Sequence, residues 1–375
     1  MKTYSYFCLA LALCLSLLFP MFTYAEEEPI LKVTIDDALQ IAYANNPDLR
    51  KANLEVEKAQ IQRDDAAKYV TWIPTGGMVV PAYQQIFNAY QQAEIALTAA
   101  KKAQASEKKR VTQEVITAYT KALKDYNTME STRIKLQDLE NQKRIAGMSM
   151  GLGLISELDY QKLDSSIKQA QEGYKSAQAA YESSIASLRY LLGKGEDWNP
   201  KLASRAVLDT YNRHELNVEL SRGLSESVLV MTQKALLDIE KSKEDWILPN
   251  VSSNMQKINS GMAEINYEQA KRNAKATIEQ LYYGIDALEG QIQAAESALA
   301  TAQKDLEIAE LKYEVGVISR YAIPGADSLS AAEVTAETAR MNIENLKADL
   351  AQMKAQFAYL TGQEPYDPAD WIAVE

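Results

Sequence analysis

The chain has 375 residues, with 40 Lys plus Arg against 51 Asp plus Glu, so its formal net charge of −11 argues against nucleic acid as a partner. Aromatic residues make up only 8% of the sequence, and Gly and Pro are scarce at 15 and 10, whereas Ala, Gln, Glu, Lys and Leu fill whole stretches. This composition is typical of long helices and coiled coils, and it argues against a sandwich, a barrel enzyme or a doubly wound fold.

The first 25 residues have the pattern of a secretory signal peptide. Lys2 is followed by an apolar run from Tyr6 to Met21, and Thr23-Tyr24-Ala25 places small residues where a signal peptidase cleaves. The run is short for a membrane-spanning helix, and three glutamates follow it. Both cysteines of the chain lie in this segment. We therefore expect an exported chain that starts at Glu26 and has neither a disulfide nor a reactive thiol.

The first half of the mature chain is predicted to form two shorter helices and one very long one. Thr34-Ile35-Asp36-Asp37 offers a hydroxyl cap and acids in the first turn, and Asn45-Asn46-Pro47 then ends that helix. A second helix follows from Asp48 to Ala67. Gly and Pro are absent from Ala82 to Ala146, so a helix from about Ile86 to Ala146 would be roughly 90 Å long.

The second half carries a heptad repeat on two successive segments. Apolar residues alternate steps of four and three in both. The first set is Leu281, Ile285, Leu288, Ile292, Ala295, Leu299, Ala302, Leu306, Ala309 and Tyr313, and the second is Leu329, Ala332, Ala336, Ala339, Ile343, Leu346, Leu350, Met353, Phe357 and Leu360. The pattern predicts an antiparallel hairpin that supercoils to the left.

The mature chain is a tandem repeat. A shift of 169 places Phe357, Tyr359, Leu360 and Gly362 on Leu188, Tyr190, Leu191 and Gly193, so both halves end in Leu-x-Gly. Each half runs from a helix through a proline-marked break, a very long helix and a glycine-bearing tip to a return helix. The predicted organisation is a signal peptide at 1–25, a first repeat at 26–193, a linker at 194–223, a second repeat at 224–362 and a tail at 363–375.

The layout resembles the outer-membrane efflux protein family, the TolC-like exit ducts of bacterial export systems. The resemblance rests on Thr34 to Arg50, which fits the opening motif of the family, on Tyr313 to Ser319 (Y-E-V-G-V-I-S), and on the two Leu-x-Gly endings. It covers nearly the whole mature chain. It implies an all-α tandem repeat of long antiparallel coiled-coil helices, a TolC-like helical barrel, located in the outer membrane and periplasm.

The resemblance further implies a homotrimer that exports small molecules or proteins passively, together with a periplasmic adaptor (membrane fusion protein) and an inner-membrane pump. The family's adaptor-docking element stands at the tip of each hairpin, and Val315-Gly316-Val317 occupies that place in the second half. In the first half, two positions are candidates for the adaptor-docking element. Gly147 fits the offset of 169, whereas Gly153 and Leu154 fit an offset of 163.

Family members also carry a membrane-spanning strand pair in each half, and here these strands are greatly shortened. Only short strand-like or loop remnants are expected at residues 69–85 and 246–261, because neither stretch alternates apolar and polar residues over a membrane-spanning length. Four residues in these stretches are candidates for a membrane-proximal position, with ordinary packing as the alternative: Trp72, Pro74, Trp246 and Pro249.

Charged residues near the tips are candidates for a gate or constriction, since rings of charge select ions and pair across subunits. They are Glu157, Asp159, Arg320 and Asp327. The alternative is that they are solvated ends of coiled coils.

The sequence contains no glycine-rich phosphate loop, no G-x-S-x-G and no zinc-ligand spacing, and its one histidine, His214, reads as a solvated linker residue. It therefore predicts no enzyme, no cofactor and no metal. Two functions remain: an efflux conduit, or a periplasmic or cell-surface coiled-coil protein that acts as a scaffold or spacer. A duct needs a closed ring of subunits, so the oligomeric state separates them.

Overall fold

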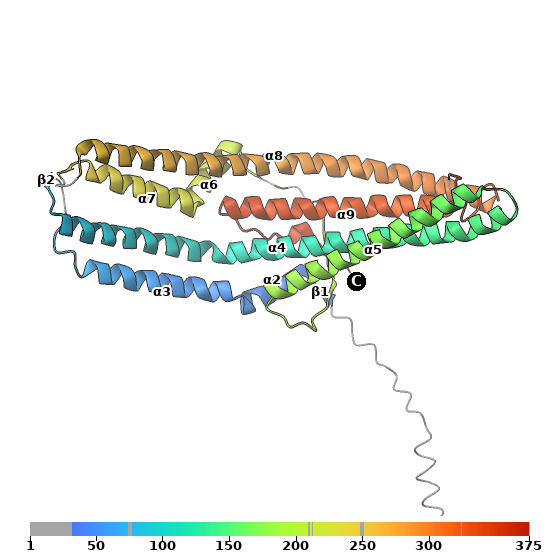
Figure 1. The fold of residues 1–375 in the computed structure, drawn as a ribbon, viewed down its shortest axis with the longest axis horizontal. Helices are drawn as coiled ribbons and strands as arrows, with labels where there is room; N and C mark the ends of the chain where they lie inside the picture. The colour runs from blue at the N-terminus through green and yellow to red at the C-terminus, as the bar shows by residue number, and fades with distance from the viewer. Residues whose placement is uncertain are drawn as a thin grey trace, which may run out of the picture.

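The computed structural model describes residues 32–73, 77–208, 211, 213–247, 251–323 and 325–374. The predicted signal peptide, with Cys8 and Cys14, lies outside these residues. The described chain is elongated and almost entirely helical, with long helices parallel to its long axis (Figure 1). The predicted all-α fold of long antiparallel helices is confirmed.

The described part of the first repeat contains four helices. They are α2 (Ile35–Asn45), α3 (Pro47–Ala67), α4 (Pro81–Gly151) and α5 (Glu157–Leu191). Thr34 caps α2 as predicted, because its hydroxyl accepts the Asp37 N–H at 3.1 Å while the Asp37 carboxylate accepts the Thr34 N–H at 3.0 Å. Asn46 then caps α3, whose first residue is Pro47. The predicted break at this proline is thus an elbow between two helices.

The second repeat has the same order of helices: α6 (Leu216–Glu226), α7 (Val228–Lys243), α8 (Ser253–Glu314) and α9 (Leu329–Leu360). Helices α2 and α6 have 11 residues each, and Ser227 caps α7 as Asn46 caps α3. Helix α6 therefore repeats α2, although its first residues fall inside the segment that the sequence assigns to a linker.

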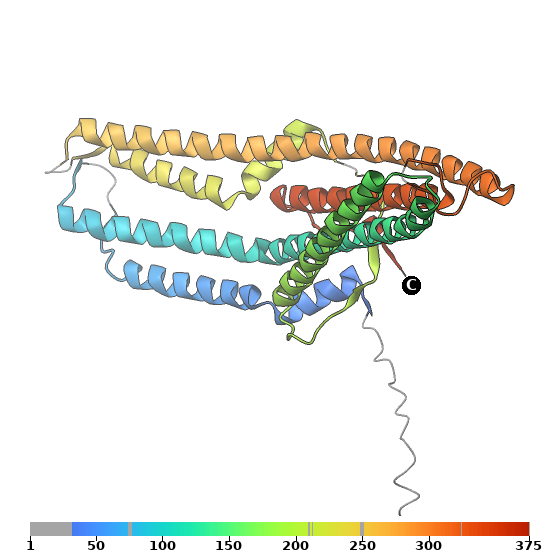
Figure 2. The ribbon, with the colours of Figure 1, turned by 45° about the vertical axis from the view of Figure 1, so that its right-hand side comes forward.

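The long helices form a single layer. Helices α3 and α5 follow one another along α4, α7 and α9 follow one another along α8, and α7 and α9 lie between α4 and α8 (Figures 1 and 2). The layer thus has α3 along one edge and α8 along the other. Figure 2 also shows α5 crossing α4 obliquely.

The heptad residues hold the second hairpin together as predicted. Ile285 and Ile292 of α8 and Leu350 and Phe357 of α9 are almost fully buried. Of the predicted stripe residues, only Tyr313, at the end of α8, is exposed. Both return helices stop where expected, at Gly193 and Gly362, whose positive φ angles of 63° and 72° suit glycine.

Within the described ranges, three two-stranded sheets connect the elements. At the middle of the molecule β1 (Lys32–Val33) pairs in parallel with β3 (Lys201–Leu202), and β4 (Ser204–Ala206) pairs antiparallel with β6 (Trp371–Ala373) next to η1 (Pro368–Asp370). At one end of the long axis β2 (Gly77–Met78) pairs in parallel with β5 (Trp246–Ile247).

The strand-like remnants occupy fewer residues than the sequence analysis predicts. Helix α4 begins at Pro81 and α8 at Ser253, so residues 81–85 and 253–261 are helical rather than strand-like or loop. Helix α4 can begin at Pro81 because the N–H groups of the first turn have no partner within the helix, so a proline there loses no hydrogen bond. For α8, the hydroxyl of Ser252 accepts the Met255 N–H at 3.2 Å and caps the helix.

Candidate functional site

The two hairpin turns lie together at one extremity of the molecule and have the same backbone. Gly153 and Gly316 both have a φ of 73°, and each stands two positions after the last residue of a long helix. The N–H of Leu154 donates to Ser149 O at 2.9 Å and the N–H of Val317 donates to Lys312 O at 2.7 Å, which closes both helices with a Schellman-type cap. Gly153 is therefore the structural counterpart of Gly316, whereas Gly147 lies within α4.

Both tips present apolar side chains to the outside. Leu152 and Val315 precede the tip glycines and are each 75% exposed, and Leu154 and Val317 come after them at 69% each. The two halves thus offer matched pairs of apolar side chains at equal exposure. Charged residues flank the pair of the second tip, whereas the first tip has none between Ile145 and Ser156. Such a surface is typical of a protein-docking element.

The two tips differ in how the chain continues into the return helix. In the first half the Ser156 hydroxyl accepts the Asp159 N–H at 3.1 Å, and α5 starts at once. In the second half a loop runs from Ser319 to Ser328, whose backbones pair as an isolated bridge, and Ser328 caps α9. This loop forms a groove with the end of α4, lined by Ile145, Ser149, Val317, Tyr321, Ile323 and Asp327.

Three of the predicted gate residues make contacts within their own hairpins. Glu157 accepts from Gln161 at 3.2 Å, and Arg320 lies 3.3 Å from Glu333. Asp159 accepts from the Ser156 hydroxyl and from Lys162, and these bonds hold the pKa of its carboxyl below the usual range. The fourth, Asp327, lines the groove of the second tip. Within the described residues of one chain, the four candidates are near one extremity but form no ion pair with one another.

Polar contacts join the two hairpins behind the tips. The Ser330 hydroxyl of α9 donates to the buried Asp138 carboxylate of α4 at 2.6 Å, and Asn127 donates to Asn345 at 2.9 Å. Within the first hairpin, Lys143 and Lys168 hold the pKa of Asp164 at about 2. These contacts fix the register of α4 against α9 and of α4 against α5.

The opposite extremity contains two of the four predicted membrane-proximal residues, Trp72 and Trp246. Trp246 is buried, with its ring centre 5.9 Å from that of Phe87, and Val79 completes this small core. Trp72 is 46% exposed and meets Tyr83 edge-on at 6.3 Å. The structure therefore separates the two tryptophans, one in the core and one at the surface. Pro74 and Pro249 lie outside the described residues.

Both edges of the helical layer carry exposed apolar stripes. On α8 the stripe consists of Met255, Ile258, Met262 and Ile265, which are spaced by three and four residues and so lie on one face. On α3, Leu54 and Ile61 are exposed one heptad apart. Apolar side chains at this spacing are typical of coiled-coil interfaces. Here they are exposed, so the described part of a single chain does not cover them.

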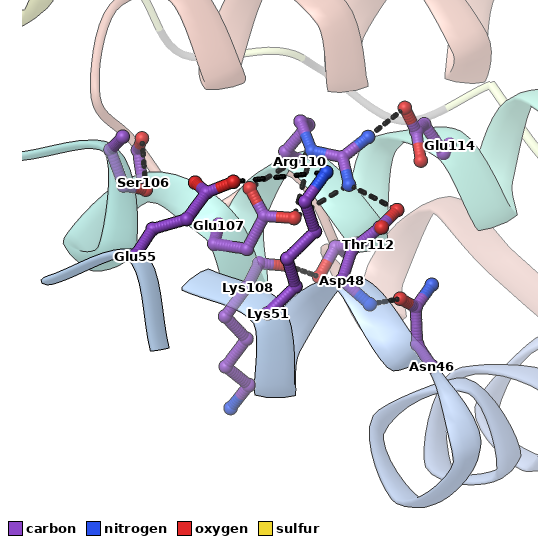
Figure 3. A network of polar contacts seen from close by, with 11 residues as sticks. Asn46, Asp48, Lys51, Glu55, Ser106, Glu107, Lys108, Arg110, Thr112 and Glu114 are labelled. Carbon is purple, nitrogen blue, oxygen red and sulfur yellow. Dashed lines mark hydrogen bonds and ion pairs between the residues drawn. The ribbon is translucent and has the colours of Figure 1, made fainter. Parts of the chain in front are cut away.

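A network of charged groups holds the elbow of α2 and α3 on α4 (Figure 3). Arg110 lies 2.9 Å from Asp48 and 2.6 Å from Glu107, and it also pairs with Glu114. Hydrogen bonding to Glu107 contributes most to the raised pKa of the guanidinium. The sequence analysis missed this cluster, although the spacing of Glu107, Arg110 and Glu114 by three and four on one helix is a signal for it.

The described residues give no sign of a metal site, since no group of three or more His, Cys, Asp or Glu side chains converges among them. His214 is exposed, and its backbone N–H donates to the buried Glu219 at 3.1 Å. None of the helices in the described ranges is both long enough and apolar enough to cross a membrane.

Comparison with known proteins identifies the second half directly. Residues 250–363 match the family model of the outer membrane efflux protein. This part of the chain is similar to an outer membrane efflux protein domain. It contains α8, the second tip and α9, and so includes Val315, Gly316 and Val317. The first tip, at Gly153, repeats its geometry outside the matched residues. No curated protein matches the sequence.

Solved structures extend the likeness to nearly the whole chain. The CmeC outer membrane channel of Campylobacter jejuni superposes with a TM-score of 0.63 at 13% identity, over 89% of this chain and 87% of that one. CusC gives 0.61 at 15% identity, over 89% and 93%. The outer membrane protein VceC of Vibrio cholerae gives 0.56 at 13%, over 88% and 97%. The efflux protein domain is thus part of a molecule with the fold of these channels.

The resemblance read from the sequence is confirmed by these matches. The expected location in the outer membrane and periplasm agrees with the family of the matched domain and with the outer membrane channels that share the fold.

Proposed function

We propose that this protein is a passive efflux duct, in which three copies close into a hollow helical cylinder that an adaptor connects to an inner-membrane pump. The outer membrane efflux protein domain and the channel fold support transport as the general role. The duct requires no chemistry from the chain, only a closed wall and docking surfaces.

The observation that carries the proposal is the pair of exposed apolar edges. The α8 stripe lies along one edge of the layer, and Leu54 and Ile61 lie along the other. A layer with two different, complementary edges pairs head to tail, so that α8 of one copy packs against α3 and α5 of the next. Such contacts close into a ring when the layer is curved. With four helix widths per copy, three copies supply the twelve-helix cylinder that the family resemblance implies.

The tips support the adaptor as partner. A ring places all tips at one mouth, where the exposed pairs Leu152 with Leu154 and Val315 with Val317 alternate around the opening. Repetition of a small apolar contact around a ring strengthens binding without enlarging any single contact. A partner that itself presents a helical hairpin would fit between neighbouring tips.

The experiment that tests the duct is the mass of the purified protein in mild detergent, measured by light scattering. We expect a trimer for the unchanged protein. Replacing Met262→Glu together with Ile265→Glu on the α8 edge is expected to give monomers, because the carboxylates would be buried without partners in the interface.

Val218→Glu is the matched control, since Val218 is also exposed but belongs to neither stripe and lies on α6, which packs against α8. We expect this variant to stay trimeric. A monomeric unchanged protein, or an α8 variant that remains trimeric, would contradict the closed ring and leave the coiled-coil spacer as the better function.

A further inference from the structure

A pocket lies inside the helical layer, where α7 begins and α9 ends between α4 and α8 (Figure 1). We call it the wall pocket. Its volume is about 480 Å³, within the range of roughly 300–1,000 Å³ that is typical of small-molecule sites. Its lining comes from α4, the α6–α7 elbow, α8 and the end of α9, so it joins one helix of the first repeat to the helices of the second.

The wall pocket is not a result of loose packing around it. A Cβ added to Gly223 would collide with the side chain of Ile278, and one added to Gly362 would collide with that of Glu226. The α6–α7 elbow therefore already lies as close to α8 and to the end of α9 as side chains allow. Beside these contacts the pocket is lined from α4 and α8 by four small residues: Ala105, Ser106, Ala270 and Ala274. These small side chains leave a space that larger ones would fill.

Most of the wall is apolar. Its larger members are Val228, Leu229, Ile278, Tyr359 and Leu360. The hydroxyl of Ser106 donates to Ala103 O, and that of Thr277 donates to the carbonyl of Asn273, both at 3.0 Å. Because both hydroxyls already donate within their own helices, the wall favours an apolar chain over a polar one.

Two lysines of α4 bring positive charge to this apolar wall. The Lys102 ammonium donates to Ser225 O at 2.5 Å and lies 3.6 Å from the carboxylate of Glu226, which also lines the pocket. The Lys109 ammonium is half-buried and donates to Gly362 O at 2.6 Å. Among the residues that the structure describes, Lys109 has no carboxylate within ion-pair distance. An ammonium has three N–H donors, so Lys109 supplies a cation in excess beside the pocket.

We propose that the wall pocket binds a small amphiphilic monoanion, with its carboxylate or sulfonate group on Lys109 and a single alkyl or aryl chain along the apolar wall. A partly desolvated ammonium is stabilised by an anion, and burial of the chain adds the hydrophobic contribution. The volume suits one chain rather than the two of a phospholipid. A ligand there contacts α4 as well as the second repeat and so holds the two repeats together. The site lies within one chain, so binding does not depend on closure of the ring.

The test is labelling of the purified protein with a photoactivatable decanoate, a ten-carbon carboxylate that carries a diazirine, followed by peptide mapping with mass spectrometry. We expect labels on the peptides that contain residues 228–229 and 270–278. Excess decanoate should prevent this labelling, whereas decyltrimethylammonium, a cation with a chain of the same length, should not. Equal competition by the cation would overturn the anion as ligand, and labels found only elsewhere would overturn the site.

Phosphatidylglycerol separates a free amphiphile from a membrane lipid as the source of the ligand. It carries a negative charge but has two acyl chains, so we expect it not to compete with the probe. Competition by phosphatidylglycerol as strong as that by decanoate would assign the pocket to a lipid and overturn the single-chain ligand.

Lys109→Met removes the charge but keeps a long side chain, and it is expected to lower labelling at the pocket about tenfold. Lys101→Met is the matched control, because Lys101 is exposed on the same helix and does not line the pocket. We expect its labelling to be unchanged. Equal losses in the two variants would show that the charge of α4 as a whole, and not the pocket, attracts the probe.

Ala274→Phe tests the site without changing either lysine. The ring would fill the pocket from α8, so labelling should be lost while Lys109 keeps its hydrogen bond to Gly362 O. Circular dichroism measures whether each variant is folded. Labelling that persists in the folded phenylalanine variant would show that the probe binds elsewhere, and the wall pocket would then not be its site.

Discussion

At the scale of single residues, Tyr119 shows how the middle of the molecule is joined. Its side chain is fully buried, its hydroxyl donates to Val33 O at 2.9 Å, and the same oxygen accepts the Ser204 N–H at 2.9 Å. Burial raises the pKa of this tyrosine to about 12. One hydroxyl therefore connects α4 to the chain ahead of α2 and to the segment after α5.

Tyr119→Phe is expected to lower the free energy of unfolding by about 1–3 kcal/mol, because the Ser204 N–H and the Val33 carbonyl lose a buried partner. The pKa in the fold lies above the ordinary value of 10, so the neutral phenol stabilises the folded state fully below pH 10. This stability is lost as the pH rises toward 12. Urea unfolding at pH 8, 10 and 11.5 measures both effects.

The variant should lose less stability than the unchanged protein over the same alkaline range. The Tyr119→Phe variant is still expected to lose some stability at alkaline pH, because burial also raises the pKa of Tyr211 to about 12. Equal alkaline losses in the two proteins would show that ionisation of Tyr119 does not limit stability at high pH.

At the scale of elements, the hairpin tips depend on a glycine conformation. Gly316 has a φ of 73°, and a Cβ added there would meet no atom within 4 Å. A substitution is therefore penalised by backbone strain and not by a clash.

Gly316→Val is expected to cost about 1–2 kcal/mol locally and to abolish adaptor docking, while the helices stay folded. Circular dichroism and a binding assay with the purified adaptor hairpin measure the two quantities. Gly151→Ala is the control, because Gly151 ends α4 in a helical conformation with open space around it. Unchanged docking by the valine variant would count against the tip as the docking element.

The sequence predicts the helices well because their signals are local and repeated. The Thr34 cap, the Asn46-Pro47 break and the heptad stripes of α8 and α9 all depend on residues a few positions apart. The first tip shows the limit. Gly147 and Gly153 are both acceptable by sequence offset, and only the hydrogen bonds that close α4 select Gly153.

Features formed between distant residues could not be predicted in this way. Strands of two or three residues, such as β1 with β3 and β4 with β6, are too short to show a pattern. The exposed stripe of α8 is missed for a related reason. Its steps of three and four predict a contact, but a single sequence does not say whether the partner is the same chain or another copy.

At the scale of the whole molecule, the two repeats share one core at the middle. Residues of α2, α4 and α5 pack there with Ala355 of α9, and the C-terminal segment adds Trp371, whose ring meets Tyr119 edge-on at 5.8 Å. Lys354 of α9 lies 2.7 Å from Asp370 in the same region, and both side chains are buried. The segment after Gly362 thus fastens both halves to each other.

The Lys354–Asp370 ion pair tests whether this fastening governs the stability of the whole chain. Asp370→Asn leaves the lysine ammonium buried without its carboxylate partner, and we expect a loss of about 3 kcal/mol in the free energy of unfolding. Lys354→Met combined with Asp370→Leu removes both charges and should restore most of that loss, since apolar side chains of similar volume suit a buried site. Urea unfolding followed by helical circular dichroism measures both variants.

If the core at the middle of the molecule couples the two repeats, Asp370→Asn lowers the urea midpoint of a single transition that includes all the helices. A variant in which only part of the helical signal is lost at lower urea would show instead that the two repeats unfold separately.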